Sequence, residues 1–344
     1  MIQAALRKLT VGEQLPEEEI FRIIGGIRKG EITDVQIAGF LVALLMKGPT
    51  TREVASIARA MRANCEQIAP KVDGALIDTC GTGGGRTTFN CSTAVAMVAA
   101  ASGIPVAKHG SRSLASSSGS ADVLEKLGVA IDLSPKQAEK LIETAGIGFL
   151  YAPNFHPVML KVLPAEMALG IKTIFYTIIG PLINPAGANR HVLGVYKPEL
   201  VAMVADILVE LKFDHALVVH GLDGLDEISV IGKTSIAEVK EGWAKKYEVM
   251  PGDLGLPRYT YEELTGGSPQ DNANILTAIL TGREQGARRD MVLANAAAAL
   301  LVGGKVDRLR EGVGLAAELI DNGSAKKKLD ELIAESNRIA SAPQ

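Results

Sequence analysis

The chain has 344 residues, of which 47% are hydrophobic and 22% are charged, so it can bury one large core or two domains. Its formal net charge of −3 offers no basic surplus for binding nucleic acid or an anionic membrane. Its apolar runs are too short or too interrupted by glycine to cross a bilayer, and its start lacks the apolar stretch of a signal peptide. Three cysteines without zinc-type spacing, Cys65, Cys80 and Cys91, fit a reducing compartment. We therefore expect a cytoplasmic protein that binds neither nucleic acid nor a membrane.

The first seventy residues carry apolar side chains at helical spacing only. The predicted helices cover residues 16–25, 33–46 and 51–65. The pairs Thr33-Asp34 and Thr50-Thr51 stand where N-terminal caps are expected. This part of the chain therefore predicts a small all-helical layer.

From residue 75 onward, short apolar strands alternate with helices. Strands are predicted at 75–78, 104–108, 148–151 and 216–220, and helices at 92–101, 122–127 and 134–145. The segment 163–185 is punctuated by Gly and Pro and indicates a crossing between layers, whereas 251–270 reads as a long loop. Amphipathic helices then cover 273–280, 289–302, 306–322 and 325–339. The alternation predicts an α/β fold with a mostly parallel sheet flanked by helices on both faces.

The loop after the first strand is rich in glycine. It contains Gly81, Gly83, Gly84 and Gly85. Without a Cβ, such residues adopt positive φ and bring backbone N–H groups close to an anion. The next helix begins near Asn90, Ser92 and Thr93. Helix N-termini also favour phosphate, so we expect a phosphate cradle. The dinucleotide fingerprint fails because position 86 is Arg, and no P-loop motif is present; the alternative is a turn that merely needs glycine.

A second polar loop follows the second strand. Lys108 ends the strand, and the next residues are His109, Gly110, Ser111 and Arg112. Hydroxyl groups then follow at Ser113, Ser116, Ser117, Ser118 and Ser120. A lysine at the carboxyl end of a strand reaches the sheet edge where α/β proteins bind ligands, and serines donate to phosphate oxygens. The alternative for any single serine is a turn or a helix cap.

Adjacent carboxylates follow the strand at 216–220. Asp226 and Glu227 are hard oxygen ligands of the kind that hold Mg²⁺ against substrate phosphates. A metal between these carboxylates and the two phosphate loops would explain all three elements. The alternative is a solvated loop with surface carboxylates.

Many ordered motifs across nearly the whole chain carry a family resemblance. They are QIAGFLVALLMKGPT, ASIARAMR, GTGG, NCST, KHGSR, SGSADVLEKLG, TIFYTIIGPLINP, GVY, HGLDGLDEIS, GGSPQDNANILTAILTG and RDMVLANAAAALLVGG. In this order they resemble the anthranilate phosphoribosyltransferase family, which acts in tryptophan biosynthesis. The resemblance is specific because it rests on many motifs and not on one glycine loop.

The resemblance implies a small helical domain hinged to a larger α/β domain. The helical domain would comprise residues 1–72 plus about 164–188, and the α/β domain 73–163 plus 189–344. Members of the family form homodimers through the helical part and bind phosphoribosyl pyrophosphate with Mg²⁺ in the hinge cleft. They displace pyrophosphate from ribose C1 with the amine of an aromatic acceptor.

The matching motifs imply the site residues of this chain. The donor would contact Gly81, Gly84, Gly85, Thr88, Asn90, Ser92, Thr93, Lys108, His109, Gly110, Arg112, Ser116 and Ser120. The acceptor would contact Gly81, Ser111, His156, Glu166 and Gly180. Magnesium would be held by Ser92, Asp226 and Glu227. No residue is assigned as a general base or nucleophile, because an arylamine has a free lone pair and the transition state needs charge stabilisation by Lys108 and the metal.

The chain departs from the family pattern at a few positions. The glycine loop is one residue shorter than usual and lacks its Asp. On the acceptor side, Ser111, Phe155 and Glu166 replace the usual Asn, His and Arg. A carboxylate roughly 4 Å from Glu166 would be repelled by about 4 kcal/mol at an effective dielectric constant near 20. If Glu166 faces the acceptor pocket, anthranilate should bind poorly unless Arg112, Lys161 or Lys172 substitutes for the missing Arg. The alternative is that the motif is displaced locally or that Glu166 points away.

Three functional hypotheses follow from these residues. The first is phosphoribosyl transfer to anthranilate. The second is a family paralogue that acts on another aromatic amine or heterocycle, or a nucleoside-phosphorylase-like enzyme. The third is a noncatalytic or nucleic-acid-binding relative, which the acidic balance and the retained Asp226 and Glu227 disfavour.

Overall fold

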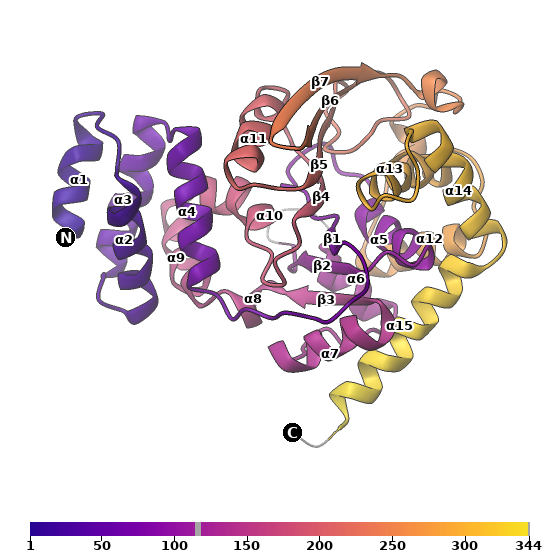
Figure 1. The fold of residues 1–344 in the computed structure, drawn as a ribbon, viewed down its shortest axis with the longest axis horizontal. Helices are drawn as coiled ribbons and strands as arrows, with labels where there is room; N and C mark the ends of the chain where they lie inside the picture. Colours follow the sequence, from indigo (N-terminus) through magenta and orange to yellow (C-terminus); the bar gives the residue numbers. More distant parts are fainter. Residues whose placement is uncertain (114–117, 343–344) are drawn as a thin grey trace.

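A computed structural model describes residues 1–113 and 118–342 of the chain. Four helices form one end of the molecule: α1 (Ile2–Thr10), α2 (Glu17–Lys29), α3 (Asp34–Lys47) and α4 (Thr51–Ala63) (Figure 1). Thr33 and Thr50 cap α3 and α4, each in a reciprocal capping box, as the sequence predicts. The predicted ranges overlap α2, α3 and α4, although α2 continues four residues beyond the predicted end at residue 25, and α1 lies outside the predictions.

A second segment of the chain packs on these helices. It contains α9 (Pro157–Leu169), a π-helical turn η1 (Phe175–Ile179) and the short α10 (Gly180–Leu182). Helix α9 lies against α2 and α3, and the ring of Phe175 meets Phe40 edge to face with centroids 6.4 Å apart. Apolar burial therefore joins two segments that are distant in sequence. The division into domains at 72, 164 and 188 stays a prediction.

The larger part of the molecule is built on a seven-stranded sheet in the order β3-β2-β1-β4-β5-β6-β7. Its strands are β1 (Ile77–Asp78), β2 (Val106–Gly110), β3 (Ile147–Tyr151), β4 (Arg190–Gly194), β5 (His215–Gly221), β6 (Thr234–Lys240) and β7 (Trp243–Val249). The first five strands pair in parallel, and β6 and β7 pair antiparallel at one edge. The predicted mostly parallel sheet is confirmed, but β4, β6 and β7 were not among the predicted strands.

Both faces of the sheet are covered, as β5 illustrates. Its alternate residues Leu217 and Val219 join one apolar core, whereas Ala216 and Val218 join a second core on the opposite face. The first core contains α5 (Cys91–Ala101) and α13 (Ala287–Val302); the second contains α11 (Glu199–Glu210) and the N-terminal helices. The strand is therefore buried on both sides, as expected for a parallel sheet.

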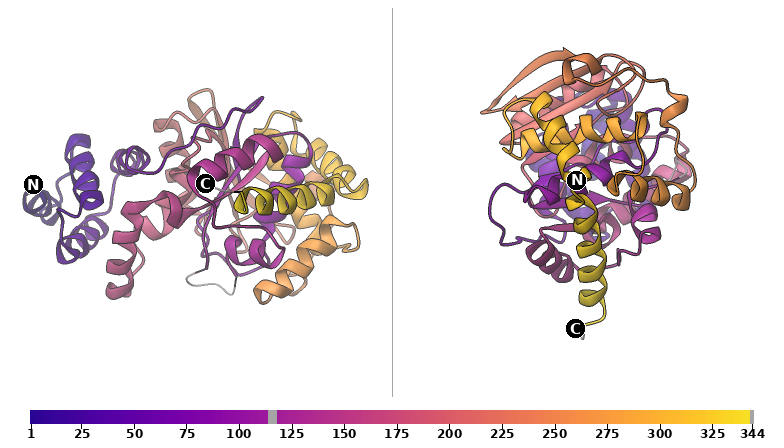
Figure 2. Two further views of the ribbon diagram at one scale, coloured as in Figure 1. Left: turned by 90° about the horizontal axis from the view of Figure 1, so that it is seen from below. Right: turned by 90° about the vertical axis from the view of Figure 1, so that its right-hand side faces the viewer.

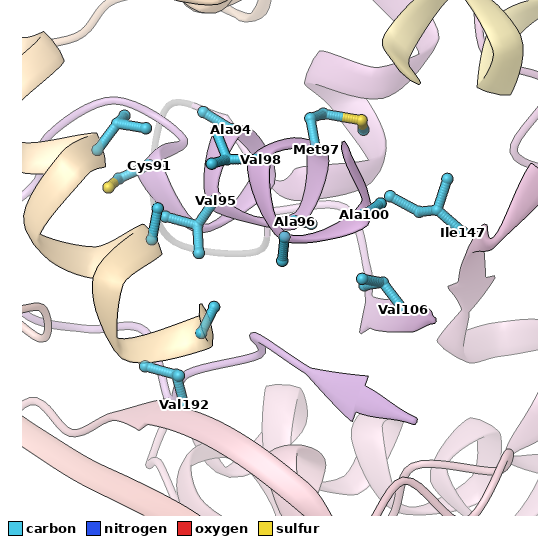
Figure 3. Close-up of a cluster of buried hydrophobic side chains, with 14 of the residues drawn as sticks. Cys91, Ala94, Val95, Ala96, Met97, Val98, Ala100, Val106, Ile147 and Val192 are labelled. Atoms are coloured by element: carbon cyan, nitrogen blue, oxygen red, sulfur yellow. The ribbon is translucent and has the colours of Figure 1, made fainter. Parts of the chain in front are cut away.

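Helix α5 lies at the centre of the first core. Figure 3 shows Val95 and Ala96 on the side of α5 nearest Val192 and Val106 of the sheet. Helix α5 also packs on α13 and on α15 (Ser324–Ala340). Small side chains along α5 permit this close packing, so the N-terminus of the helix has a fixed position at the edge of the sheet.

The remaining helices enclose the sheet and complete the C-terminal half (Figures 1 and 2). They are α6 (Ser120–Lys126), α7 (Pro135–Ala145), α8 (Ala152–Phe155), α12 (Pro269–Leu280) and α14 (Leu309–Asp321). The predicted loop at 251–270 contains two short 3-10 turns, Pro251–Leu254 and Glu262–Leu264. Among the residues described, no helix is both long and apolar enough to cross a membrane.

Candidate active site

A cleft of about 850 Å³ opens at the carboxyl ends of β1 and β4. From β1 the chain builds β2 and β3 on one side, and β4 and β5 lie on the other. The order of the strands therefore reverses between β1 and β4, and such a switch point is where open α/β sheets bind ligands. The segment from α8 to α10 forms the opposite wall of this cleft.

The glycine loop lies across the end of β4. A Cβ on Gly81 would lie 3.0 Å from the carbonyl oxygen of Gly194, and one on Gly85 would lie 2.6 Å from Asp226 Oδ1. Gly84 adopts φ +87°, which a side chain would strain. Glycine is therefore required both by the close contacts and by the conformation of the backbone. The loop touches the strand on one side and the acidic loop on the other.

The glycine loop is also held by contacts on its outer side. The backbone N–H of Arg86 donates to the carbonyl of Gly224 (2.9 Å), and its guanidinium carbon lies 3.6 Å from the centroid of the Tyr261 ring. The Tyr261 hydroxyl donates to the carbonyl of Thr87 at 2.7 Å. These contacts hold the glycine loop over the cleft.

Lys108 and the start of α5 form the floor of the cleft. The Lys108 ammonium is buried, with 3% of the residue exposed, and donates to Thr79 Oγ1 (3.3 Å) and Ser92 Oγ (3.2 Å). Asn90 Oδ1 accepts hydrogen bonds from Ser118 Oγ (3.0 Å) and Asn272 Nδ2 (2.9 Å). A fixed cation beside a helix N-terminus and the glycine loop makes this region suited to an anion.

Asp226 and Glu227 lie on the β5 side of the cleft, half-buried. Burial raises the pKa of Glu227 to about 8, and the negative charge of Asp226 contributes to the same rise. Burial also raises the pKa of Asp226. Neither carboxylate forms an ion pair with a described residue. Two adjacent carboxylates that lack a compensating charge are suited to a divalent cation.

No cluster of three or more His, Cys, Asp or Glu side chains that could enclose a metal occurs among the described residues. The two carboxylates would therefore share a cation with other oxygen ligands. Magnesium is commonly held in this manner, by one or two carboxylates together with water and substrate phosphates. The oxygen atoms of these two carboxylates fit that ion.

The opposite wall of the cleft is less polar. The Nε2 atoms of His109 and His156 lie 3.1 Å apart, and burial lowers the pKa of both imidazoles, so the pair is neutral at physiological pH. Phe175 and Tyr176 of the π-helical turn also line this wall, together with Lys172. The wall therefore offers rings and one cation to a second, smaller ligand.

Comparison with known proteins decides the family. The chain matches the model of the glycosyl transferase family α/β domain over residues 73–326 and that of the family's helical bundle domain over residues 3–65. It is 48% identical to the anthranilate phosphoribosyltransferase of Acetivibrio thermocellus over 342 residues, which cover 99% of this chain and 98% of that protein. The enzyme of Alkaliphilus metalliredigens is 46% identical, over 98% of this chain and 99% of its own length.

Solved structures agree with the sequence matches. The anthranilate phosphoribosyltransferase of Thermus thermophilus superposes with a TM-score of 0.90 at 41% identity, over 97% of this chain and 99% of that one. The enzyme of Saccharomyces cerevisiae, solved in complex with PRPP and Mg, has a TM-score of 0.87 at 27% identity, over 98% of each chain. This chain belongs to the anthranilate phosphoribosyltransferase family. It is a glycosyltransferase-type enzyme, and the resemblance inferred from its motifs is confirmed.

Most residues predicted for the site of this family member line one cleft. They are Gly81, Gly84, Gly85, Asn90, Ser92, Lys108, His109, Gly110, Ser111, Arg112, Ser120, His156, Gly180, Asp226 and Glu227. Thr88 lies behind the lining and donates to Glu227 Oε2 at 3.4 Å. Thr93 is fully buried in α5, and Ser116 lies outside the described residues. The tertiary structure therefore brings together residues from segments far apart in the chain, while their individual roles stay predictions.

Glu166 differs from the expectation that it contacts the acceptor. Only 3% of the residue is exposed, and it does not line the cleft. Its carboxylate accepts hydrogen bonds from the backbone N–H of Thr173 (2.8 Å) and from the Thr173 hydroxyl. The side chain points away into the turn after α9, so the predicted repulsion of an acceptor carboxylate by direct contact does not arise.

Two buried polar residues shape the site without having been predicted. Asp78 Oδ1 accepts from the backbone N–H groups of Thr79, Cys80 and His109 at 2.7, 3.1 and 3.2 Å, which ties β1 to β2. Asn295 of α13 accepts from the Ile228 N–H (2.8 Å) and donates to its carbonyl (2.9 Å), holding the acidic loop. A charged residue in an apolar strand was the available signal for Asp78. For Asn295, the sequence offers no signal of this role beyond its position in an alanine-rich helix.

Proposed function

We propose that this protein transfers phosphoribose from phosphoribosyl pyrophosphate to anthranilate, releasing pyrophosphate, as a step of tryptophan biosynthesis. The observation that carries the proposal is the meeting of the glycine loop, Lys108 and the Asp226–Glu227 pair at the switch point of the sheet. A donor with two phosphate groups and a cation requirement matches this combination. The identities of 48% and 46% to relatives that carry this activity in their names support the same conclusion.

The donor side would bind and stabilise the leaving group. Cleavage of the C1–O bond leaves oxocarbenium-like charge on the ribose and negative charge on pyrophosphate. The N–H groups of the glycine loop and the hydroxyl of Ser92 can donate to phosphate oxygens, and the buried ammonium of Lys108 adds a fixed positive charge. Because these donors are already held in place, little reorganisation accompanies the reaction.

Ser92, Asp226 and Glu227 would hold Mg²⁺, the cofactor inferred from the carboxylate pair. When bound, the ion neutralises negative charge on the pyrophosphate. The S. cerevisiae relative was solved with PRPP and Mg, which supports the same assignment.

The acceptor side would orient an arylamine and exclude water. The amine has a free lone pair and attacks C1 without a strong base, so the contribution of this wall is positioning. The neutral His109–His156 pair, Phe175 and Tyr176 line the wall on which it would lie. The S. cerevisiae relative was also solved with 4-fluoroanthranilate.

An assay with phosphoribosyl pyrophosphate, Mg²⁺ and anthranilate tests the proposal through the loss of anthranilate fluorescence. We expect turnover by the wild type and none by Asp226→Asn in the same buffer, because the substitution removes one charge from the carboxylate pair. Calorimetry with phosphoribosyl pyrophosphate separates the alternatives. Donor binding without anthranilate turnover would refute the proposal and favour a paralogue with another aromatic amine, a heterocycle or phosphate as acceptor.

A homodimer and a cytoplasmic location belong to the proposal as well. Val35 and Met46 of α3 are 83% and 79% exposed and stand eleven residues apart, about three turns, so they lie on one face. An apolar face on the N-terminal helices supports self-association there. Light scattering should give twice the chain mass of 36.2 kDa, and a monomer mass at micromolar concentration would contradict the dimer.

A further inference from the structure

We infer that Lys172 recognises the carboxylate of the acceptor and takes the role that an arginine at position 166 would have. The inference deepens the proposed function and rests on it, since it assigns the specificity of the same cleft for an acidic aromatic amine. It concerns one side chain on the turn between α9 and the π-helical turn η1.

The positively charged side chains of the cleft differ in where they lie and in whether a carboxylate pairs with them. Within the described residues, its lining contains Lys108, Arg112, Lys172 and Lys197. Lys108 is buried on the donor side, and Arg112 is paired with Asp122 and Glu125 at 3.0 and 2.9 Å. Lys197 follows β4 and lies next to Tyr196, the residue that packs beside the glycine loop. Lys172 is the cation on the acceptor wall.

Lys172 has no described carboxylate within ion-pair distance. Its Nζ lies 5.2 Å from the centroid of the Tyr176 ring, and both residues line the cleft. The side chain is exposed, so its charge is available to a ligand that enters this part of the cleft. An ammonium held over an aromatic ring can meet a carboxylate while the ring stacks on the arene that bears it.

The turn that carries Lys172 is anchored by buried contacts on its next residue. Thr173 donates both its N–H and its hydroxyl to the carboxylate of Glu166, and the Thr173 hydroxyl oxygen accepts from the Phe175 N–H at 3.2 Å. The π-helical turn that follows, Phe175–Ile179, widens the helix where Tyr176 enters the cleft. Glu166 is therefore an anchor of the turn, and its burial keeps its own charge away from the acceptor.

The shape of the wall fits one ring with one charged group. Leu160 and Leu163 of α9 line the same cleft as Lys172 and Tyr176, so its lining combines apolar side chains with this cation. A ring placed on this surface would direct one substituent toward Lys172. A carboxylate at that position gains a charge-assisted contact, whereas a neutral group gains none.

Steady-state kinetics of Lys172→Met with anthranilate and with phosphoribosyl pyrophosphate test the inference. We expect the KM for anthranilate to rise about 10-fold to 100-fold while the KM for phosphoribosyl pyrophosphate stays within about twofold, because only the carboxylate contact is lost. Lys172→Arg should retain most of the affinity. The matched control is Lys161→Met on α9, whose Nζ lies 3.1 Å from the Cβ position of Gly30 and outside the cleft lining.

A neutral competitor separates charge recognition from a structural effect. 2-Aminobenzamide keeps the ring and the amine but has no negative charge, and its inhibition constant should be the same in the wild type and in Lys172→Met. An equal loss for both compounds, or an unchanged KM for anthranilate, would overturn the assignment to Lys172. If the wild type binds phosphoribosyl pyrophosphate but does not turn over anthranilate, the proposed function fails first and this inference with it.

Discussion

Gly194 at the end of β4 is the point where the sheet meets the acidic loop. A Cβ built on this glycine would lie 1.6 Å from the backbone oxygen of Asp226 and 2.6 Å from its carbonyl carbon. Both atoms are backbone, so neither can rotate away as the end of a side chain would. The substitution Gly194→Ala therefore has to move the loop that carries Asp226 and Glu227.

The size of the displacement follows from the contact distance. Ordinary van der Waals separation between carbon and oxygen is about 3.5 Å, so the Asp226 carbonyl must retreat by roughly 1.5–2 Å. Misplacement of catalytic groups by about 1 Å costs on the order of 100-fold in rate. We therefore expect kcat/KM to fall at least about 100-fold, and the overpacking to cost about 1–3 kcal/mol of unfolding free energy.

The fluorescence assay for anthranilate turnover and a thermal melt measure the two effects separately. Gly314→Ala is the matched control, because Gly314 lies exposed in α14 with no atom within 4 Å of its Cβ position. That variant should keep wild-type activity and melt at the same or a higher temperature. A Gly194→Ala protein with wild-type kcat/KM would refute the reasoning, since the acidic loop would then be dispensable or free to move.

Two further substitutions test buried polar contacts. Asn295→Ala leaves the N–H and carbonyl of Ile228 without these side-chain partners, so it should cost about 2–4 kcal/mol of unfolding free energy and lower kcat. As a control, Asn274→Ala at an exposed position of α12 should leave the melting temperature unchanged. Burial opposes ionisation of Glu53, but hydrogen bonds from Lys47, Thr50 and Leu15 outweigh it and lower its pKa below 4.5. The folded state then binds fewer protons, so this stabilisation is present above pH 4.5 and lost as pH falls further. Glu53→Gln should therefore lower the free energy of unfolding by about 3–5 kcal/mol at about pH 7. In urea melts, the difference in unfolding free energy between the wild type and this variant should shrink toward about pH 3. A difference that stays constant with pH would contradict the pKa shift.

Local patterns in the sequence predicted much of the fold and of the donor side. The capping residues Thr33 and Thr50, the strand that ends near Lys108 and the strand before Asp226 all depend on neighbouring residues in the chain, which is why local spacing predicts them. The strands β6 and β7 lie toward one edge of the sheet, where exposed charged residues such as Lys245, Lys246 and Glu248 interrupt the apolar pattern, so the sequence did not predict them. Strand β4 begins with the polar residues Arg190 and His191 and ends in Gly194, so its sequence offers only Val192 and Leu193 as an apolar signal.

The acceptor wall could not be predicted from the chain in this way. The sequence places Glu166 where the family has Arg and so predicts repulsion, but the direction of a side chain depends on what packs around it. Only the tertiary structure buries Glu166 against Thr173 and leaves Lys172 facing the cleft.

The sequence by itself determined which two loops are candidates for binding phosphate, because glycine, lysine and hydroxyl groups at this local spacing are typical of such sites. The tertiary structure decided that these loops meet at the switch point between β1 and β4, beside a carboxylate pair that follows β5. It also decided which cation faces the second ligand. Both outcomes depend on strand order and on packing between segments that are distant in the chain, and no local pattern encodes such contacts.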